Sequence, residues 1–307
     1  MLELPVLHMR ATLFRLIRSF FDDRGFLEVD TPLRQPIFIP ESTIVPLATD
    51  GQYLQTSPEL CMKRLLAQGC DKIYQICPCF RKGEIGRLHL EEFTMLEWYR
   101  SGVDYLDLMS DCEDLLHYIA LNLEPVALSG SGNPYPKWFS KTDIVSDWQR
   151  MSVAEAFQLF SPVSLTDALE NDQFDELLVE YIEPHLGFGV PTFLYDYPVE
   201  QGSLAKRSVK APGVVERFEL YINGVELANG FSELTDSEEQ RGRFIEEIAV
   251  MEKDGRSGVK IPERFLDDLQ KLDNAAGIAL GVDRLFMLLM GYDNLAEAVT
   301  FHPGDFL

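Results

Sequence analysis

The chain has 307 residues, and 46% of them are hydrophobic, which is enough to bury the core of one large domain or of two small ones. Its 50 acidic and 27 basic residues give a formal net charge of −23, which argues against a broad nucleic-acid-binding surface, because such surfaces neutralise phosphates with Lys and Arg. No apolar run approaches the about 18 to 20 residues of a membrane span, and no signal peptide is evident, so we expect a globular, cytoplasmic protein.

The first helical pattern lies at 9–24, where apolar residues recur on one face and Gly25 is placed to end the helix. A strand is expected at 26–31, ending at Pro32, which cannot donate a hydrogen bond to a neighbouring strand. Packing into the core is one interpretation of this helix and strand, and a self-association surface is the other.

A second helix is expected to begin near Pro58, beneath a Ser57 cap, with Glu59 in its first turn. Glu59 either complements the helix dipole or faces a cleft and binds an amine.

The cysteines are odd in number and lack zinc-type spacing, so we interpret them as small core residues, with metal binding by the Cys77–Cys79 pair as the alternative. They are Cys61, Cys70, Cys77, Cys79 and Cys112.

The segment 72–100 is predicted to form a strand, a charged glycine-containing loop and a second strand. Alternation places Phe93, Met95, Glu97 and Tyr99 on one face of the second strand, opposite the core-forming face that contains Trp98. We therefore expect the first of these faces to line a cleft. The alternative is a solvated hairpin with an apolar back.

After a helix expected at 105–123, the turn-rich stretch 129–141 is predicted to be a loop insertion within a single domain, 1–307. Helical patterns resume at 152–160 and 172–185, and 191–198 is expected to be a buried strand.

Alternating runs on either side of Asn223-Gly224 predict a β-hairpin at 214–234. Regular pairing would place Glu219 opposite Ala228, so that the carboxylates of Glu219 and Glu226 project from one face as diagonal neighbours. Such a pair suggests a hard-metal site, most simply Mg²⁺ bridging substrate phosphates, and the alternative is two solvated acids.

A glycine-flanked strand that runs directly into an apolar helix is predicted at 277–289. Arg284 would lie in the first turn of this helix, where a cation is unfavourable, so it either binds a phosphate or pairs with a nearby acid.

Three segments together resemble motifs 1, 2 and 3 of the class II aminoacyl-tRNA synthetases: FLEVDTP, FRKGEIGRLHLEEFTMLEWYR and GIALGVDRLFMLLMG. TSPE, EFTMLEWY and GVELANGFSEL are similar to the lysyl branch. Only about 25 residues precede the motif-1-like strand, so we expect no anticodon-binding domain. That architecture resembles the lysyl-tRNA synthetase paralogues that attach β-lysine to a lysine side chain of translation elongation factor P.

The resemblance implies an α+β fold with a mostly antiparallel sheet flanked by helices, and a homodimer. It implies that Arg81 bridges the α-phosphate and the amino-acid carboxylate, that Phe93 stacks on adenine and that Arg284 clamps ATP. Glu219 and Glu226 would hold Mg²⁺.

For the amino acid, the resemblance implies that Glu59 takes the backbone-side amine and Asn229 the carboxylate, and that Tyr99 with Glu233 takes the terminal ammonium. Regular alternation places Asn229 on the opposite face from Glu226, so this role requires a bend or bulge before Gly230. The remaining substrate positions are Ser57, Pro58 and Ala279. The remaining ATP positions are Lys82, Gly83, Glu84, His89, Leu90, Leu227 and Gly281.

The motif-2-like segment departs from the family pattern F-R-x-E, because Gly83 stands at the fourth position and Glu84 follows it. Either Glu84 substitutes through a rearranged loop, or Phe93 and backbone groups alone hold adenine. Ala279 replaces the glycine usual in the tRNA-charging enzymes, which favours the branch that modifies elongation factor P.

The function implied is ATP-dependent activation of lysine or β-lysine and its transfer to elongation factor P, without nucleic acid or a membrane. Two alternatives stay open. One is an enzyme that charges tRNA or ligates a free amino acid, and the other is a binding or regulatory paralogue that forms no adenylate.

Overall fold

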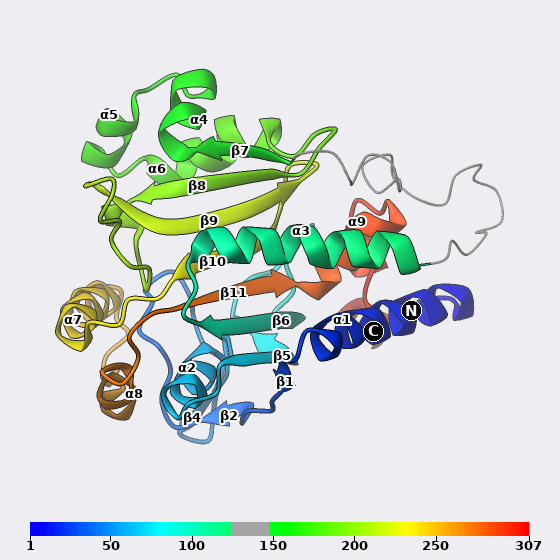
Figure 1. The fold of residues 1–307 in the computed structure, drawn as a ribbon, viewed down its shortest axis with the longest axis horizontal. Coiled ribbons are helices and arrows are strands. Elements are labelled where there is room, and N and C mark those ends of the chain that lie inside the picture. Colours follow the sequence, from blue (N-terminus) through cyan, green and yellow to red (C-terminus); the bar gives the residue numbers. More distant parts are fainter. Residues whose placement is uncertain (124–147, 307) are drawn as a thin grey trace.

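The computed structural model describes residues 1–123 and 148–306, and its centre is an eight-stranded, mostly antiparallel sheet flanked by helices (Figure 1). This confirms the α+β expectation. The predicted insertion at 129–141 lies outside the described residues. In the described part of the chain, no helix is both long and apolar enough to cross a membrane.

The strand order in the large sheet is β1-β5-β6-β11-β10-β9-β8-β7, and only its two outermost pairs are parallel. The strands are β1 (Leu27–Glu28), β5 (Lys72–Phe80), β6 (Glu92–Ser101), β11 (Ala275–Gly281), β10 (Val225–Ser232), β9 (Val214–Ile222), β8 (Thr192–Pro198) and β7 (Gln149–Ser152). A small second sheet has the order β2-β4-β3, formed by Arg34–Gln35, Gln52–Leu54 and Ala48–Thr49.

The helices cover both faces of the large sheet (Figure 1). They are α1 (Leu4–Asp23), α2 (Glu59–Ala67), α3 (Tyr105–Asn122), α4 (Val153–Phe160), α5 (Leu165–Glu170), α6 (Phe174–Leu177), α7 (Ser237–Lys253), α8 (Glu263–Leu269) and α9 (Val282–Met290). The helix expected at 172–185 is irregular: after α6 it continues as a π-helical turn, Leu178–Ile182, and a 3₁₀ turn, Glu183–His185.

The predicted first helix is confirmed but begins earlier, because Pro5 lies in its first turn, where the missing proline N–H is no loss. Gly25 follows its end with a φ of 73°, which favours glycine. The strand expected at 26–31 was predicted too long, since only Leu27–Glu28 pairs with β5, at the sheet edge. One further backbone hydrogen bond, from Val29 to Tyr74, follows before the chain turns away.

Alternation in β6 divides the sheet into two faces. Leu96 and Trp98 are fully buried in the largest core cluster, which they share with residues of α1, α3 and α9. Glu97 and Tyr99 point to the other face, as predicted, where α2, α7 and α8 pack at one end and α4 to α6 at the other. The space between these two helical groups contains the candidate site.

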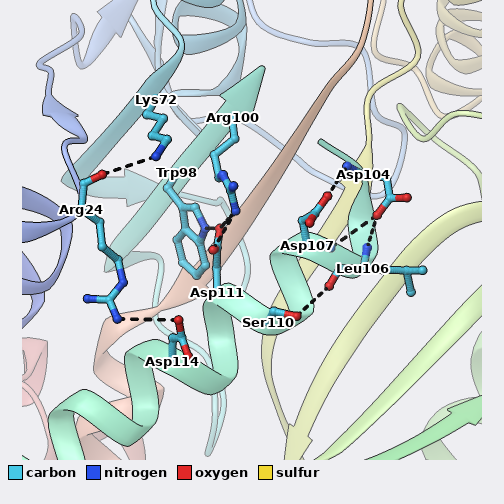
Figure 2. Close-up of polar contacts among 10 residues, drawn as sticks. All are labelled: Arg24, Lys72, Trp98, Arg100, Asp104, Leu106, Asp107, Ser110, Asp111 and Asp114. Carbon is cyan, nitrogen blue, oxygen red and sulfur yellow. Dashed lines mark hydrogen bonds and ion pairs between the residues drawn. The ribbon is translucent and has the colours of Figure 1, made fainter. Parts of the chain in front are cut away.

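Helix α3 contacts the core-facing side of β6 through polar groups (Figure 2). Asp104 caps α3 in a reciprocal capping box with Asp107, which ends the preceding strand sharply. One turn further, Asp111 accepts hydrogen bonds from Trp98 Nε1 at 3.3 Å and from Arg100 Nη1 at 2.8 Å. These contacts hold the core-facing side chains of β6 against α3, and strand alternation places the next residues on the opposite face.

The β9–β10 hairpin turns at Asn223-Gly224 as predicted, and both residues have positive φ, 51° and 71°. The expected pairing of Tyr221 with Glu226 is confirmed. The expected pairing of Glu219 with Ala228 is wrong.

A β-bulge between Glu226 and Ala228 shifts the register, so that Ala228 lies opposite Leu220 and Asn229 lies opposite Glu219. The extra residue reverses the alternation that a regular strand would impose. As a result Glu226 and Asn229 share one face, and this is the bulge that the Asn229 role requires.

Candidate active site

A cavity of about 440 Å³ lies on the sheet face opposite α1 and α3. Its walls come from β6, β10, β11, the first residues of α2 and α9, and the loop between β5 and β6. Strand register explains why distant segments meet there: Glu219, Asn229, Ala279 and Glu97 form one row of cross-strand neighbours across β9, β10, β11 and β6.

Most of the predicted site residues line this one cavity. They are Ser57, Glu59, Arg81, Glu84, His89, Leu90, Phe93, Tyr99, Glu226, Leu227, Asn229, Ala279, Gly281 and Arg284.

Five predicted residues do not reach the cavity wall: Pro58, Lys82, Gly83, Glu219 and Glu233. Lys82 and Gly83 are exposed on the outside of the loop, where the backbone N–H of Gly83 donates to Glu91 at 2.7 Å. Pro58, Glu219 and Glu233 are buried directly behind residues that do line the wall.

At one end of the cavity, Glu97 is 1% exposed and is held by two hydroxyl donors. Ser57 Oγ donates to its Oε1 at 2.5 Å, and Tyr99 donates to its Oε2 at 2.8 Å. Burial, and secondarily the nearby charge of Glu59, raises the pKa of Glu97 to about 8. An incoming cation would relieve that repulsion.

Behind this end lies Lys63, which the sequence analysis did not identify. Its ammonium pairs with Glu59, four residues earlier on α2, and with Glu233, whose Oε2 is 2.5 Å from Lys63 Nζ. The other oxygen of Glu233, Oε1, has no hydrogen-bond partner among the described residues. The only sequence signal was the i, i+4 spacing between Glu59 and Lys63, which is common on solvated helices.

Burial raises the pKa of Glu233 to about 8, against the lowering effect of Lys63 and with a further increase from Glu59. Burial alone would lower the pKa of the Lys63 ammonium, but Glu233 and Glu59 outweigh it and raise that pKa overall. This end therefore gathers three buried carboxylates, of Glu59, Glu97 and Glu233, around one internal cation.

Midway along the cavity, the guanidinium of Arg81 lies 5.3 Å from the centre of the Phe93 ring. Its Nε donates weakly to the Thr56 carbonyl at 3.4 Å, and its Nη1 is 3.8 Å from Glu84. Glu84 thus turns toward the cavity while Gly83 turns away. This supports the first of the two motif-2 alternatives, in which Glu84 substitutes through a rearranged loop.

At the other end, Arg284 is held by backbone and side-chain acceptors. Its Nη1 donates to the Glu226 carbonyl at 2.8 Å and to Glu226 Oε2 at 3.3 Å, and its Nη2 is 2.8 Å from His89 Nε2. Burial and the Arg284 charge lower the pKa of His89, so the neutral ring can accept from the guanidinium. The expected pairing of Arg284 with an acid is present, and its side chain still lines the cavity.

The side wall contains a third arginine, Arg217, which the sequence analysis missed. It donates to Glu219 Oε1 at 2.6 Å and to Asn229 Oδ1 at 3.2 Å. Tyr221 donates to the second oxygen of Glu219 at 2.6 Å. Arg217 and Glu219 are two residues apart in β9, so alternation alone could have placed both on the cavity face.

The carboxylate oxygens of Glu219 and Glu226 suit a hard cation, and their charges repel each other. Burial raises the pKa of Glu219, Arg217 lowers it, and Glu226 raises it again. The pKa of the neighbouring Glu183 is raised to about 7, mainly by burial and additionally by the charges of Glu226 and Glu219. Within the described residues no group of three or more His, Cys, Asp or Glu side chains is arranged to hold a metal ion. Oxygen donors from two strands nevertheless fit Mg²⁺, which commonly takes one or two carboxylates and completes its shell with phosphates and water.

Comparison with known proteins places this geometry in context. Residues 4–303 match the family described as tRNA synthetases class II (D, K and N). The chain is 38% identical to the elongation factor P–(R)-β-lysine ligases of Salmonella heidelberg, Salmonella agona and Salmonella enteritidis PT4, over 97% of this chain and 95% of each relative.

Proposed function

Because the chain belongs to the family of class II tRNA synthetases (D, K and N), we propose that it activates lysine or β-lysine with ATP and transfers it to a lysine side chain of elongation factor P. The relatives' name supports this acceptor, and also the (R)-β isomer as the first amino acid to test.

The observation that carries the proposal is the distribution of charge in the cavity. Three acids, Glu59, Glu97 and Glu233, lie at one end or directly behind it, and Arg284 lies at the other, with Arg81 between them. A diammonium amino acid fits the first end and a triphosphate the second. The carboxylate of the amino acid and the α-phosphate would then meet beside Arg81.

In the first step, an oxygen of the amino-acid carboxylate attacks the α-phosphorus, the bond to the β-phosphate oxygen breaks, and pyrophosphate leaves. Arg81 and Arg284 stabilise the charge that develops on the phosphate oxygens, and Phe93 stacks on adenine. The chemistry requires no protein nucleophile, because positioning and fixed charges supply the catalysis.

In the second step, an acceptor lysine loses its proton and attacks the carbonyl carbon of the aminoacyl-adenylate. An amide bond forms and AMP leaves with the electrons of the broken mixed-anhydride bond. A substrate side chain without a charge would give Glu97 no ion-pair partner and would leave Glu233 Oε1 without a hydrogen bond, which gives the enzyme its selectivity for a terminal ammonium.

We propose that Glu226, which lines the cavity, holds Mg²⁺ against the substrate phosphates, and that Glu219, buried directly behind the wall, supplies the second carboxylate when the ion is bound. When bound, the ion would neutralise phosphate charge and orient the triphosphate. Arg217 keeps Glu219 oriented, and Asn229 beside it binds the amino-acid carboxylate.

The proposed assembly is a homodimer built on α1 and β1. An apolar side chain on an edge strand supports it, since Leu27 of β1 is 57% exposed. We place the enzyme in the cytoplasm, where translation factors act.

The test has two stages. Pyrophosphate exchange into ATP is measured with L-lysine, (R)-β-lysine and (S)-β-lysine. The enzyme is then offered elongation factor P and lysine tRNA separately, and the products are followed by intact mass and by acid-stable label. An Arg81→Ala variant serves as the matched inactive control.

We expect exchange with at least one lysine isomer and a mass gain on elongation factor P. A labelled tRNA with unchanged elongation factor P would instead favour the tRNA-charging alternative. Absence of exchange with every isomer would leave only a binding role.

A further inference from the structure

The least exposed cation near the cavity is one that no part of the proposed reaction uses. The Lys63 side chain is 2% exposed and does not line the cavity, so its ammonium cannot touch substrate without a rearrangement. Its neighbours on the remaining sides are the rings of Phe231 at 5.1 Å and Phe265 at 6.0 Å. A buried lysine is costly unless it is paired, which it is here, twice.

The two partners of Lys63 belong to different segments that have to act together. Glu59 opens α2 and lines the cavity, whereas Glu233 follows β10 and lies behind Gly277 and Tyr99. One ammonium between the two carboxylates therefore ties the start of α2 to the end of β10. It also leaves Glu233 Oε1 without a hydrogen bond.

The charge count at this end is informative. Three buried carboxylates, of Glu59, Glu97 and Glu233, face a single internal ammonium, which leaves an excess of two negative charges when all three are ionised. Lysine and β-lysine each bring two ammonium groups, and their single carboxylate is assigned to Arg81 and Asn229.

We propose that Lys63 is a positioning residue of the amino-acid site: it acts as an internal counter-ion that holds the Glu59 and Glu233 side chains in place, so that the pocket matches a diammonium substrate. This inference rests on the proposed function. Lys63 acts through its two partners and does not contact the substrate.

The alternative role for Lys63 is competition with the substrate ammonium. If Lys63 occupied the place of the substrate ammonium, it would compete with substrate, and its removal would improve binding. Its position behind the wall argues for the counter-ion role.

The test compares Lys63→Met with Lys63→Arg and with the matched control Arg64→Met. Arg64 is the next residue on the same helix, but its side chain is 39% exposed and pairs with Asp268, away from the cavity. Pyrophosphate exchange gives KM for the lysine isomer that the wild-type enzyme uses, kcat, and the dependence of kcat/KM on pH. Titration calorimetry gives the affinity for the same amino acid without ATP.

For Lys63→Met we expect KM to rise at least about tenfold with a smaller change in kcat, since the lost interaction orients groups that bind substrate. The acidic limb of the kcat/KM profile should move to higher pH, because loss of a positive charge raises the pKa of the remaining carboxylates. The titratable groups around Lys63 are Glu59 on its own helix, Glu97 and Tyr99 on β6, and Glu233 after β10. Lys63→Arg should restore the pH of the acidic limb of the kcat/KM profile. Arg64→Met should leave both KM and this limb unchanged.

A second variant covers the possibility that Lys63→Met does not fold. Lys63→Met combined with Glu233→Gln removes both members of one pair, so it should fold and still bind the amino acid weakly. An unchanged or lowered KM in either variant overturns the inference, as does an unshifted acidic limb. Wild-type enzyme that catalyses no exchange refutes the proposed function instead, so the two failures are distinguishable.

Discussion

Adding a single methyl group at Gly277 should disable the ammonium end of the cavity. Gly277 of β11 lies directly opposite Tyr99 of β6, and the Tyr99 ring lies over it. A Cβ at this position would be 2.2 Å from Cε1 of Tyr99 and 2.6 Å from Oε1 of Glu233. Carbon atoms in contact are about 3.5 Å apart, so the ring would have to move by more than about 1 Å.

The ring cannot move freely, because Tyr99 is 3% exposed and its hydroxyl donates to Glu97 at 2.8 Å. Overpacking of this kind lowers the free energy of unfolding by about 1 to 3 kcal/mol. A misplacement of about 1 Å among positioning groups can reduce the rate by about 100-fold. For Gly277→Ala we therefore expect a loss of about 2 kcal/mol of stability and at least about a tenfold loss of kcat/KM for the amino acid.

Urea denaturation and pyrophosphate exchange measure these two quantities. Gly242→Ala in α7 is the matched control, because nothing lies within 4 Å of a Cβ added there, and it should be neutral or stabilising by up to about 1 kcal/mol. If Gly277→Ala keeps wild-type stability and KM, then the close approach of Tyr99 to β11 does not shape the site.

Three further perturbations test other parts of the structure. Glu97 and Glu233 have pKa values raised to about 8 in the folded protein, so between about pH 5 and 8 they retain protons that the unfolded chain releases. The free energy of unfolding without substrate, measured by urea denaturation, should therefore fall as pH rises through this range. Arg10→Met should cost about 3 kcal/mol in the same assay, because it leaves the buried Asp283 carboxylate without its ion pair. Glu226→Gln should raise the Mg²⁺ concentration required for half-maximal exchange severalfold.

Each of these has its own control. The pH dependence should flatten in Glu97→Gln, and a slope that this change leaves intact would assign the titration elsewhere. Arg15→Met removes an exposed arginine of the same helix, which within 1–123 and 148–306 bonds only Thr12 three residues away, and should change stability by less than about 0.5 kcal/mol. For Glu226→Gln, an unaltered Mg²⁺ requirement would remove that residue from the proposed metal site.

Local patterns predicted those parts of the site that depend on one strand or one turn. The division of β6 into a core face and a cavity face follows from alternation alone, and the Asn223-Gly224 turn follows from the positive φ that both residues tolerate. The expected strand at 26–31 was too long because pairing at a sheet edge depends on the neighbour, β5, and the sequence of the segment contains no information about that neighbour.

The missed features depend on contacts between distant segments. Lys63 has the sequence context of a solvated helix position, and only the approach of Glu233, 170 residues later, makes it a buried cation. The bulge after Glu226 has no local sequence marker, so the predicted partner of Glu219 was wrong by one residue. Alternation could have placed Arg217 beside Glu219 on the cavity face, but its second partner, Asn229, lies on another strand.

The bulge has a consequence for engineering. It shifts the alternation of cavity-facing residues along β10 by one position. Glu226 faces the cavity before the shift, and Asn229 and Phe231 face it after the shift. A regular strand of the same length would lose this shift and turn everything downstream by half a strand repeat, sending the amide of Asn229 toward the helices on the far side. Chimeras that splice hairpins from relatives must therefore transfer the bulge together with the residue count between the turn and Gly230, even where amino-acid identity is free to vary.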